Sequence, residues 1–214
     1  MTPDSTRDGR FAPAAFLDAA RQKLHATAPS LTAVGAGDHV LNPDFLMEGG
    51  AYKDAAVLIP VVAHDPAASF ILTERTAHLS AHAGQIAFPG GKIDAGDNGP
   101  AAAALREAEE EIGLDRHSVS VIGYLDPYLS RTGYRIVPVL GRVDPAYRLA
   151  INANEVASVF EVPVAFLMSP GNHRRATRVF NGRERYFYEM PFGERYIWGV
   201  TAGIIRALYE QVFA

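Results

Sequence analysis

The arrangement of apolar and polar residues along the chain predicts strands interleaved with helices. Residues 55–63 form a continuous apolar run, which is typical of a strand buried on both faces of a sheet. Further strand-like segments are predicted at residues 69–75, 119–125, 134–143 and 156–162. Apolar residues at helical spacing predict helices at residues 13–26, 98–112, 163–168 and 198–213. This order favours an α/β fold in which helices cover a mixed β-sheet.

The same pattern divides the chain into two parts. The helix predicted at residues 13–26 carries Phe16, Ala20 and Leu24 along one side, so we expect that side to pack on the core. From there to about residue 53 the sequence has no regular period. We therefore predict an N-terminal helix and extension at residues 1–50, packed on a main domain at residues 51–214.

A β-hairpin is predicted near the C-terminal end. Asn181-Gly182 separates two strand-like segments at residues 174–180 and 183–190, and Asn-Gly is typical of a two-residue hairpin turn. Arginine matches the geometry of phosphate well, but a solvated hairpin face is our preferred interpretation of the five arginines nearby, Arg174, Arg175, Arg178, Arg183 and Arg185. The aromatic residues Tyr188 and Trp198 are assigned to the core.

Composition and charge narrow the classes of function. The 214 residues are 48% hydrophobic and 21% charged, which is ordinary for a soluble globular protein. A formal net charge of −4 argues against a generic nucleic-acid or membrane-surface binder. The lack of cysteine excludes disulfides, thiolate metal sites and a cysteine nucleophile. Neither a secretory signal nor a membrane-spanning apolar run is found, so we expect a cytoplasmic protein.

The helix predicted at residues 98–112 carries the candidate chemistry. Glu107, Glu110 and Glu111 stand at i, i+3 and i+4, so their carboxylates share an arc of about 100° on one face. Carboxylates so close repel one another unless a cation lies between them, and their oxygens suit Mg²⁺ or Mn²⁺. An isolated acidic run is more often a solvated face, but here a Pro-Gly-Gly turn at residues 89–91 precedes the helix. Ala103 is expected beneath the carboxylates, and the apolar face is assigned to Ala101, Leu105, Ala108 and Ile112.

These residues resemble a known motif. Gly91, Asp97 and the segment from Arg106 to Leu114 (REAEEEIGL) resemble the Nudix box, G-x5-E-x7-R-E-U-x-E-E-x-G-U, in which U is a bulky apolar residue. Asp97 replaces the usual glutamate, and eight residues rather than seven separate it from Arg106. That spacing is similar to the coenzyme A diphosphatase branch of the Nudix hydrolases. The upstream segments ILTERT (71–76) and GQIAFPGG (84–91) resemble the same branch, although Ser80 stands where the branch has arginine. The resemblance continues at residues 154–156 and 197–202.

The resemblance implies a Nudix-type α/β/α sandwich with a mixed β-sheet, and a Mg²⁺ or Mn²⁺ cofactor. Glu107 and Glu111 are the first candidates for metal ligands, with Glu110 as the third. Glu110 and Glu155 are candidates for the catalytic base, and Arg106 is a catalytic candidate that orients a carboxylate or a loop carbonyl rather than touching substrate. The candidate substrate-binding residues are Arg75, Gly90, Gly91 and Lys92.

The expected reaction is hydrolysis of the diphosphate of coenzyme A or acyl-CoA, giving 3′,5′-ADP and 4′-phosphopantetheine or its acyl form. One alternative is the same chemistry on ADP-ribose or another nucleoside diphosphate derivative, which Ser80 keeps open. The other is a non-catalytic Nudix-like nucleotide-binding regulator, against which the intact glutamates argue. The expected partner is a small-molecule substrate, without nucleic acid or membrane, and a homodimer is an open alternative.

Overall fold

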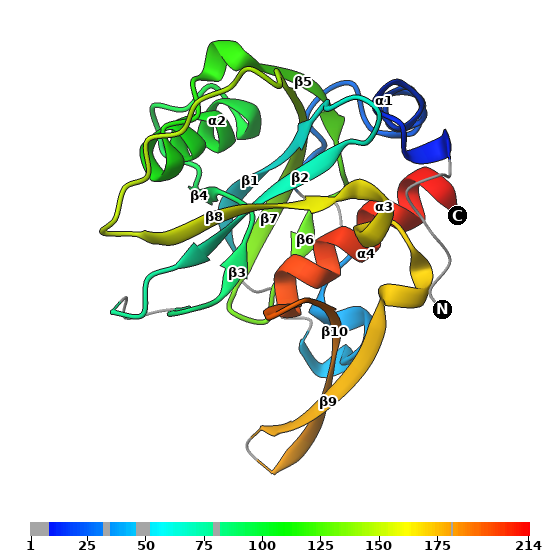
Figure 1. The fold of residues 1–214 in the computed structure, drawn as a ribbon. Helices are drawn as coiled ribbons and strands as arrows, with labels where there is room; N and C mark the ends of the chain where they lie inside the picture. The colour runs from blue at the N-terminus through cyan, green and yellow to red at the C-terminus, as the bar shows by residue number, and fades with distance from the viewer. Residues whose placement is uncertain (1–8, 32–34, 46–51, 79–81, 181) are drawn as a thin grey trace.

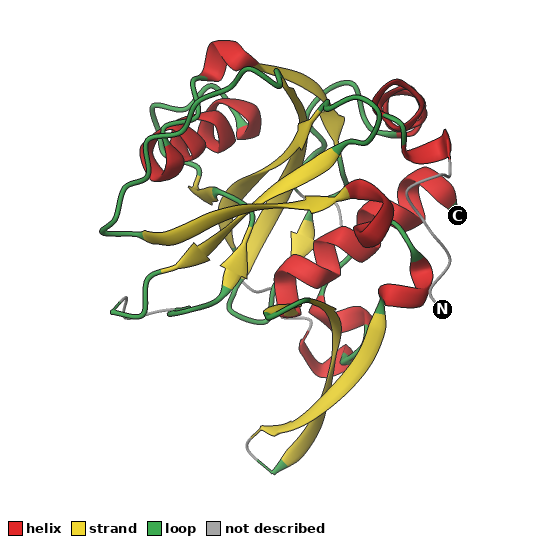
Figure 2. Cartoon of the chain, viewed as in Figure 1, coloured by secondary structure: helices red, strands yellow, loops and turns green. Residues whose placement is uncertain are grey.

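The fold is built on a mixed β-sheet with helices against both of its faces (Figures 1 and 2). The computed structural model describes residues 9–31, 35–45, 52–78, 82–180 and 182–214. Within these residues the sheet has eight strands: β1 (Lys53–Val62), β2 (Ser69–Arg75), β3 (Ile86–Ala87), β4 (Gly90–Lys92), β5 (Val119–Tyr124), β6 (Tyr128–Leu129), β7 (Tyr134–Val143) and β8 (Val156–Pro163).

The strand order is β3-β2-β1-β7-β5. In addition, β4 pairs with β1, β6 with β7 and β8 with β2. Among the pairings between the eight described strands of this sheet, the β1–β7 pair alone is parallel, so the predicted mixed sheet is confirmed. The predicted strands agree with β1, β2, β5, β7 and β8 to within a residue or two. Gly90 and Gly91 lie in β4 rather than in the expected turn, and β6 is also absent from the sequence prediction.

Successive side chains of β1 point to opposite faces of the sheet, so the apolar core has two parts, one on each face. Ala56, Leu58 and Val62 face α2 (Pro100–Ile112), while Ala55, Ile59 and Val61 face the opposite layer. That layer contains α1 (Pro13–Lys23) and α4 (Gly199–Phe213). In α1, the buried side chains are Phe16, Leu17 and Ala20, so this side of the amphipathic helix packs on the core. A single turn, α3 (Val164–Leu167), follows β8.

The ends of α2 follow from local sequence. Pro100 occupies its first turn, where a missing N–H costs nothing. Gly113 closes the helix in the left-handed conformation at φ 65°, and its N–H donates to the carbonyl of Glu109 at 3.0 Å. The predicted closure at Gly113 is confirmed.

A second, three-stranded antiparallel sheet is formed by β9 (Arg174–Phe180), β10 (Arg183–Phe192) and β11 (Arg195–Trp198). The β9–β10 hairpin extends away from the main sheet (Figure 1). The predicted hairpin strands are confirmed, although Asn181 itself lies outside the described residues. The expectation for Trp198 is wrong: it ends β11 rather than starting α4, and it is half-buried outside the two apolar clusters. Tyr188, by contrast, packs against the core.

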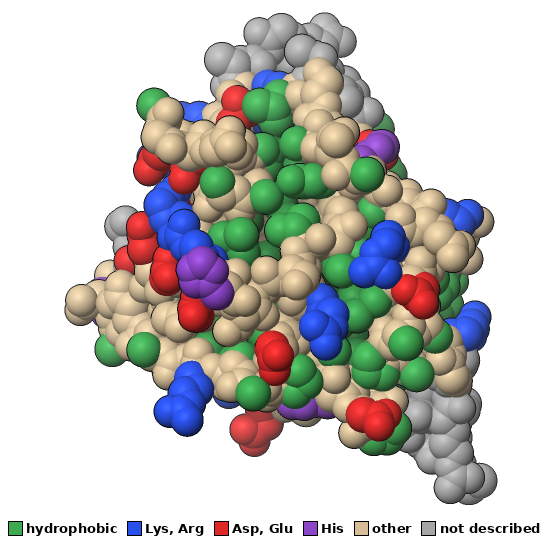
Figure 3. All heavy atoms as spheres, turned by 90° about the horizontal axis from the view of Figure 1, so that it is seen from above, with side chains coloured by type: hydrophobic (Ala, Val, Ile, Leu, Met, Phe, Trp, Pro, Cys, Tyr) green, Lys and Arg blue, Asp and Glu red, His purple; other side chains and the backbone are tan. Residues whose placement is uncertain are grey.

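Short 3₁₀ turns complete the described structure: η2 (Gly9–Phe11), η3 (Asp38–Val40), η4 (Pro43–Phe45), η5 (Arg116–Ser118) and η6 (Pro170–Asn172). No helix in the described ranges has the length and apolar character needed to span a membrane. Seen from above, side chains of both charges lie around a central group of hydrophobic side chains (Figure 3). This face therefore does not present a single strong charge.

Candidate active site

Two glycines of β4 meet two carboxylates of α2. The N–H of Gly90 donates to Oε2 of Glu111 at 3.2 Å. A Cβ on Gly91 would lie within 2.6 Å of Oε2 of Glu107, which is closer than real Cβ contacts allow. Any side chain at Gly91 would therefore displace the Glu107 carboxylate. The Gly-Gly pair allows the backbone of β4 to approach these carboxylates closely.

Glu111 is the most buried of the acidic side chains at this site, with 4% of its side chain exposed. Burial raises its pKa from 4.5 to about 7, and the negative charges of Glu107 and Glu155 act in the same direction. The guanidinium of Arg75 lies 3.3 Å from Oε1 of Glu111 and opposes this rise. Burial also raises the pKa of Glu107, and Glu110 and Glu155 contribute to that rise. The site therefore concentrates negative charge that the neighbouring arginines only partly offset.

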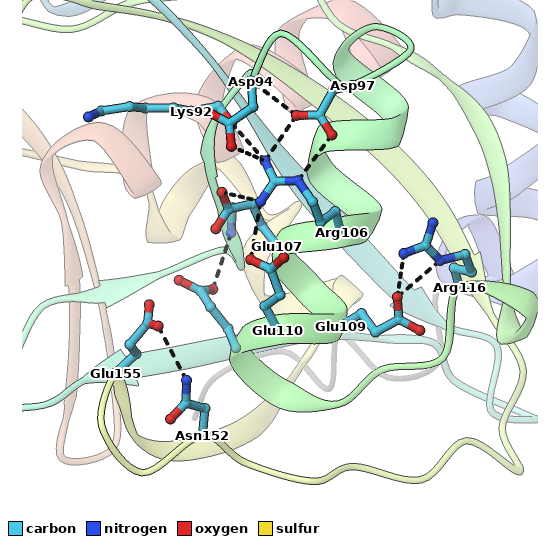
Figure 4. A network of polar contacts seen from close by, with 12 residues as sticks. Lys92, Asp94, Asp97, Arg106, Glu107, Glu109, Glu110, Arg116, Asn152 and Glu155 are labelled. Carbon is cyan, nitrogen blue, oxygen red and sulfur yellow. Dashed lines mark hydrogen bonds and ion pairs between the residues drawn. The ribbon is translucent and has the colours of Figure 1, made fainter.

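Arg106 connects the loop after β4 to the acidic face of α2 (Figure 4). Its guanidinium donates to both carboxylate oxygens of Asp97, at 3.0 and 2.9 Å, and to the carbonyl of Lys92 at 3.1 Å. It also donates to Glu107 at 3.0 Å and to Glu110 at 3.1 Å. The Arg106 hydrogen bond lowers the pKa of Asp97. These contacts have the orienting character expected of Arg106, while its importance for catalysis stays a prediction.

Glu155 lies just before β8, as expected, and accepts a hydrogen bond from Nδ2 of Asn152 at 3.2 Å (Figure 4). Its charge affects both Glu107 and Glu111, so the loop before β8 contributes to the same site as α2. Among the three α2 carboxylates, Glu110 is the most open, with 56% of its side chain exposed.

The substrate-binding candidates are less uniform. The side chain of Lys92 is exposed and extends away from the Arg106 network (Figure 4). Arg75 pairs with Glu111, while its buried Nε has no hydrogen-bond partner among the described residues. Ser80 lies outside the described residues. The substrate role of each candidate therefore remains a prediction.

The faces assigned to α2 from sequence are wrong in one respect. Ala103 is fully buried in the apolar cluster beneath β1, so it does not line the acidic site. Ala101 and Leu105 are only partly buried. The buried arc of α2 instead includes Glu111 beside Ala104 and Ala108. The carboxylates are thus inserted at the edge of the packed face, where the glycines of β4 leave room for them.

The acidic residues fit a divalent cation by charge and by ligand type. Glu107 and Glu111 offer hard oxygen ligands. Burial and the neighbouring carboxylates raise the pKa of both, and a nearby positive charge favours the ionised form of such groups. In the part of the chain that the structure describes, no three acidic or histidine side chains are grouped closely enough to hold a metal ion. Mg²⁺ typically takes only one or two carboxylates, with water and substrate phosphates completing its shell.

The pairing of Arg75 with Glu111 was not expected from the sequence. A signal for it is nevertheless present in β2, because alternate residues of a strand share a face. Ile71 belongs to the cluster that packs under α2. Arg75, four residues later, therefore points toward the same helix, where it reaches Glu111.

Comparison with known proteins gives the family. The NUDIX domain model matches residues 52–180. The chain is 40% identical over 173 residues to an uncharacterized Nudix hydrolase, NudL, of Escherichia coli. The aligned segment covers 81% of this chain and 90% of the relative. NudL of Escherichia fergusonii is 41% identical over the same shares. A solved Nudix hydrolase from M. smegmatis, RenU, aligns at a TM-score of 0.46 and 25% identity, over 54% of this chain and 72% of that chain. The family model and the NudL relatives together show that the chain belongs to the Nudix hydrolase family.

Proposed function

We propose that this protein hydrolyses the diphosphate bond of coenzyme A or acyl-CoA, with Mg²⁺ or Mn²⁺ as cofactor. The products are 3′,5′-ADP and 4′-phosphopantetheine or its acyl form. The observation that carries the diphosphatase chemistry is the pair of carboxylates formed by buried Glu111 and partly buried Glu107, beside the Gly90–Gly91 backbone. A buried acidic pair destabilises the fold at neutral pH unless a cation compensates it, so its presence supports a cation-dependent reaction.

Each residue of the site has a distinct part in this proposal. Glu107 and Glu111 would hold the metal ion, and Glu110 stays the third candidate, although the structure does not group its carboxylate with theirs as a ready-made three-ligand site within the described residues. A bound divalent ion neutralises diphosphate oxygens and lowers the pKa of the attacking water. Arg106 positions Glu107 and the loop through Asp97. Glu155 would accept the proton from water, since its Oε2 has no hydrogen bond among the described residues and only Oε1 is used by Asn152.

The choice of coenzyme A rests on two sequence features. The segments at residues 71–76 and 84–91 match the coenzyme A branch at most fixed positions, and the eight-residue gap between Asp97 and Arg106 matches it again. The structure supports the significance of that gap, because Asp97 accepts two hydrogen bonds from Arg106. A cytoplasmic location and a homodimer stay predictions.

A substrate panel tests this proposal. Coenzyme A, 3′-dephospho-coenzyme A and ADP-ribose are supplied at equal concentration with Mg²⁺ or Mn²⁺, and the products are identified by chromatography. We expect kcat/KM to be highest for coenzyme A and lowest for ADP-ribose, because a site that pairs the 3′-phosphate loses this interaction with the other two. Faster hydrolysis of ADP-ribose than of coenzyme A would overturn the proposed preference for coenzyme A but leave the diphosphatase activity standing. Tight binding of a substrate without hydrolysis of any of the three would favour the alternative of a non-catalytic nucleotide-binding regulator.

A further inference from the structure

The three-stranded sheet has one face directed away from the core. Residues paired across antiparallel strands share a face, so one face contains the β9–β10 pair Arg178–Arg185 and the β10–β11 pairs Glu189–Trp198 and Pro191–Tyr196. The opposite face contains Met190 and Ile197, which are fully buried in the core that α4 completes. The face with Trp198 is therefore the outer face.

Aromatic side chains form a platform on this outer face. The rings of Tyr196 and Trp198 lie side by side, with centroids 6.2 Å apart and planes 26° apart. Phe187 meets the edge of Trp198 at a centroid distance of 5.4 Å. Tyr196 is 40% exposed, which is high for an aromatic residue. Since Trp198 belongs to neither apolar cluster, core packing does not account for this arrangement.

Two arginines on the same face lack an acidic partner. The guanidinium of Arg178 lies 5.4 Å from the centroid of the Trp198 ring. Arg174 lies four residue pairs further along the β9–β10 ladder, on the same face and opposite Glu189. Glu189 accepts a hydrogen bond from the hydroxyl of Tyr196, and neither arginine forms an ion pair with any carboxylate of the described chain.

The arginines nearer the hairpin turn provide a contrast. Arg185 and Arg183 lie 2.6 Å and 3.4 Å from the carboxylate of Asp44 in η4. Their charge is thus compensated within the chain, whereas that of Arg174 and Arg178 is available to an anion. A second copy of the chain would bring the same arginines together if it docked through this face, and like charges disfavour that contact.

The platform is connected to the strands that lead into the active site. β11 lies against β3, and Oγ1 of Thr201 donates to the carbonyl of Ile86 at 2.9 Å. Gly90 follows Ile86 by four residues, which span at most about 13 Å in an extended chain. Arg195 of β11 also pairs with Glu74, the residue before Arg75. These connections join the sheet that carries the platform to β3 and β2, the strands that precede Gly90 and contain Arg75.

We propose that this aromatic–arginine platform, Arg174, Arg178, Tyr196 and Trp198, binds the adenine and the 3′-phosphate of the substrate. Its identification with this nucleotide rests on the proposed function. Bases stack on aromatic side chains, and guanidinium groups bind phosphate oxygens while also stacking on rings. A pair of rings beside two guanidinium groups that form no ion pair within the described chain matches a single nucleotide that carries an extra phosphate. Glu189 lies between Arg174 and Trp198, and its carboxylate accepts the hydrogen bond from the Tyr196 hydroxyl.

Trp198 is the only tryptophan of the chain, so its fluorescence reports directly on the platform. The protein is titrated with 3′,5′-ADP and with AMP in the presence of a chelator, which separates binding from hydrolysis. We expect both ligands to change the fluorescence and 3′,5′-ADP to bind at least about tenfold more tightly. Arg178→Gln should abolish this preference, and Tyr196→Leu should weaken both ligands. Arg142→Gln, at an exposed position on β7, is the matched control and should behave as wild type.

An unchanged preference in Arg178→Gln would overturn the proposal, as would an equal response to inorganic pyrophosphate, which would show general anion attraction. In turnover, Arg178→Gln should raise KM for coenzyme A about tenfold with kcat unchanged. Failure of the proposed function can be told apart from failure of the platform proposal. If the wild-type protein does not hydrolyse coenzyme A but its fluorescence responds to 3′,5′-ADP, the proposed function is rejected and the platform is supported as a nucleotide site. Hydrolysis without any change in fluorescence would reject the platform alone.

Discussion

Glu111→Gln should remove a pH dependence of stability from the metal-free protein. The carboxyl of Glu111 has a pKa of about 7 in the folded state, against 4.5 ordinarily, mainly because it is buried. Between these values the folded protein holds a proton that the unfolded chain has released. Stability is therefore full below pH 4.5, falls as the pH rises, and has lost this contribution above pH 7. Glutamine cannot ionise, so the variant should not show this loss.

The size of the effect follows from the two pKa values. Each pKa unit corresponds to about 1.4 kcal/mol, so the rise to about 7 amounts to about 3 kcal/mol between pH 4.5 and pH 8. The ion pair with Arg75 forms only when Glu111 is ionised, and its opposing effect is already included in the pKa of about 7, so it adds no separate contribution. The predicted difference therefore lies in the slope of stability against pH.

Urea unfolding at several pH values, with a chelator present, measures that slope. Wild type should lose up to about 3 kcal/mol more than Glu111→Gln between pH 5 and pH 8. Glu109→Gln is the matched control, because Glu109 is an exposed glutamate of the same helix that pairs with Arg116. It should keep the wild-type slope. Parallel curves for wild type and Glu111→Gln would refute the assignment of a raised pKa to this carboxyl.

Three further substitutions test the surroundings of the site. Arg106→Lys keeps the charge but loses the two-point hydrogen bond to Asp97, so kcat should fall about tenfold; an unchanged kcat would remove the positioning role. Gly91→Ala places a Cβ against the Glu107 carboxylate and should reduce activity about tenfold or more in a folded protein, as compared by steady-state kinetics and circular dichroism. Ala103→Leu overfills the core and should cost about 1–3 kcal/mol in urea unfolding. Normal stability with lost activity would instead place Ala103 at the site.

Features determined by local sequence could be predicted. The end of α2 at Gly113 depends on one residue in the left-handed conformation. The grouping of Glu107, Glu110 and Glu111 on one side of the helix depends only on helical geometry, although their depth in the molecule does not. That depth is set by the contact between α2 and the sheet, which brings Glu111 into the buried arc.

Features determined by distant contacts could not be predicted. Glycine disfavours strands, yet Gly90 and Gly91 join the sheet because they pair with Val57 and Ala56 of β1. Trp198 continues the apolar pattern of α4, but its pairing with Glu189 makes it the last residue of β11. The platform on the outer face depends on this pairing, so only its residue types, and not their arrangement, could be predicted.

Binding of Mn²⁺, measured by electron paramagnetic resonance on wild type and three glutamine variants, tests most directly whether the Glu107–Glu111 carboxylate pair forms the metal site. We expect one site in wild type and at least about tenfold weaker binding in Glu107→Gln and in Glu111→Gln, because each loses a charged ligand. Glu109→Gln should bind as wild type does, since its side chain pairs with Arg116 away from the site. Wild-type affinity in Glu111→Gln, or an equal loss in Glu109→Gln, would contradict the assignment.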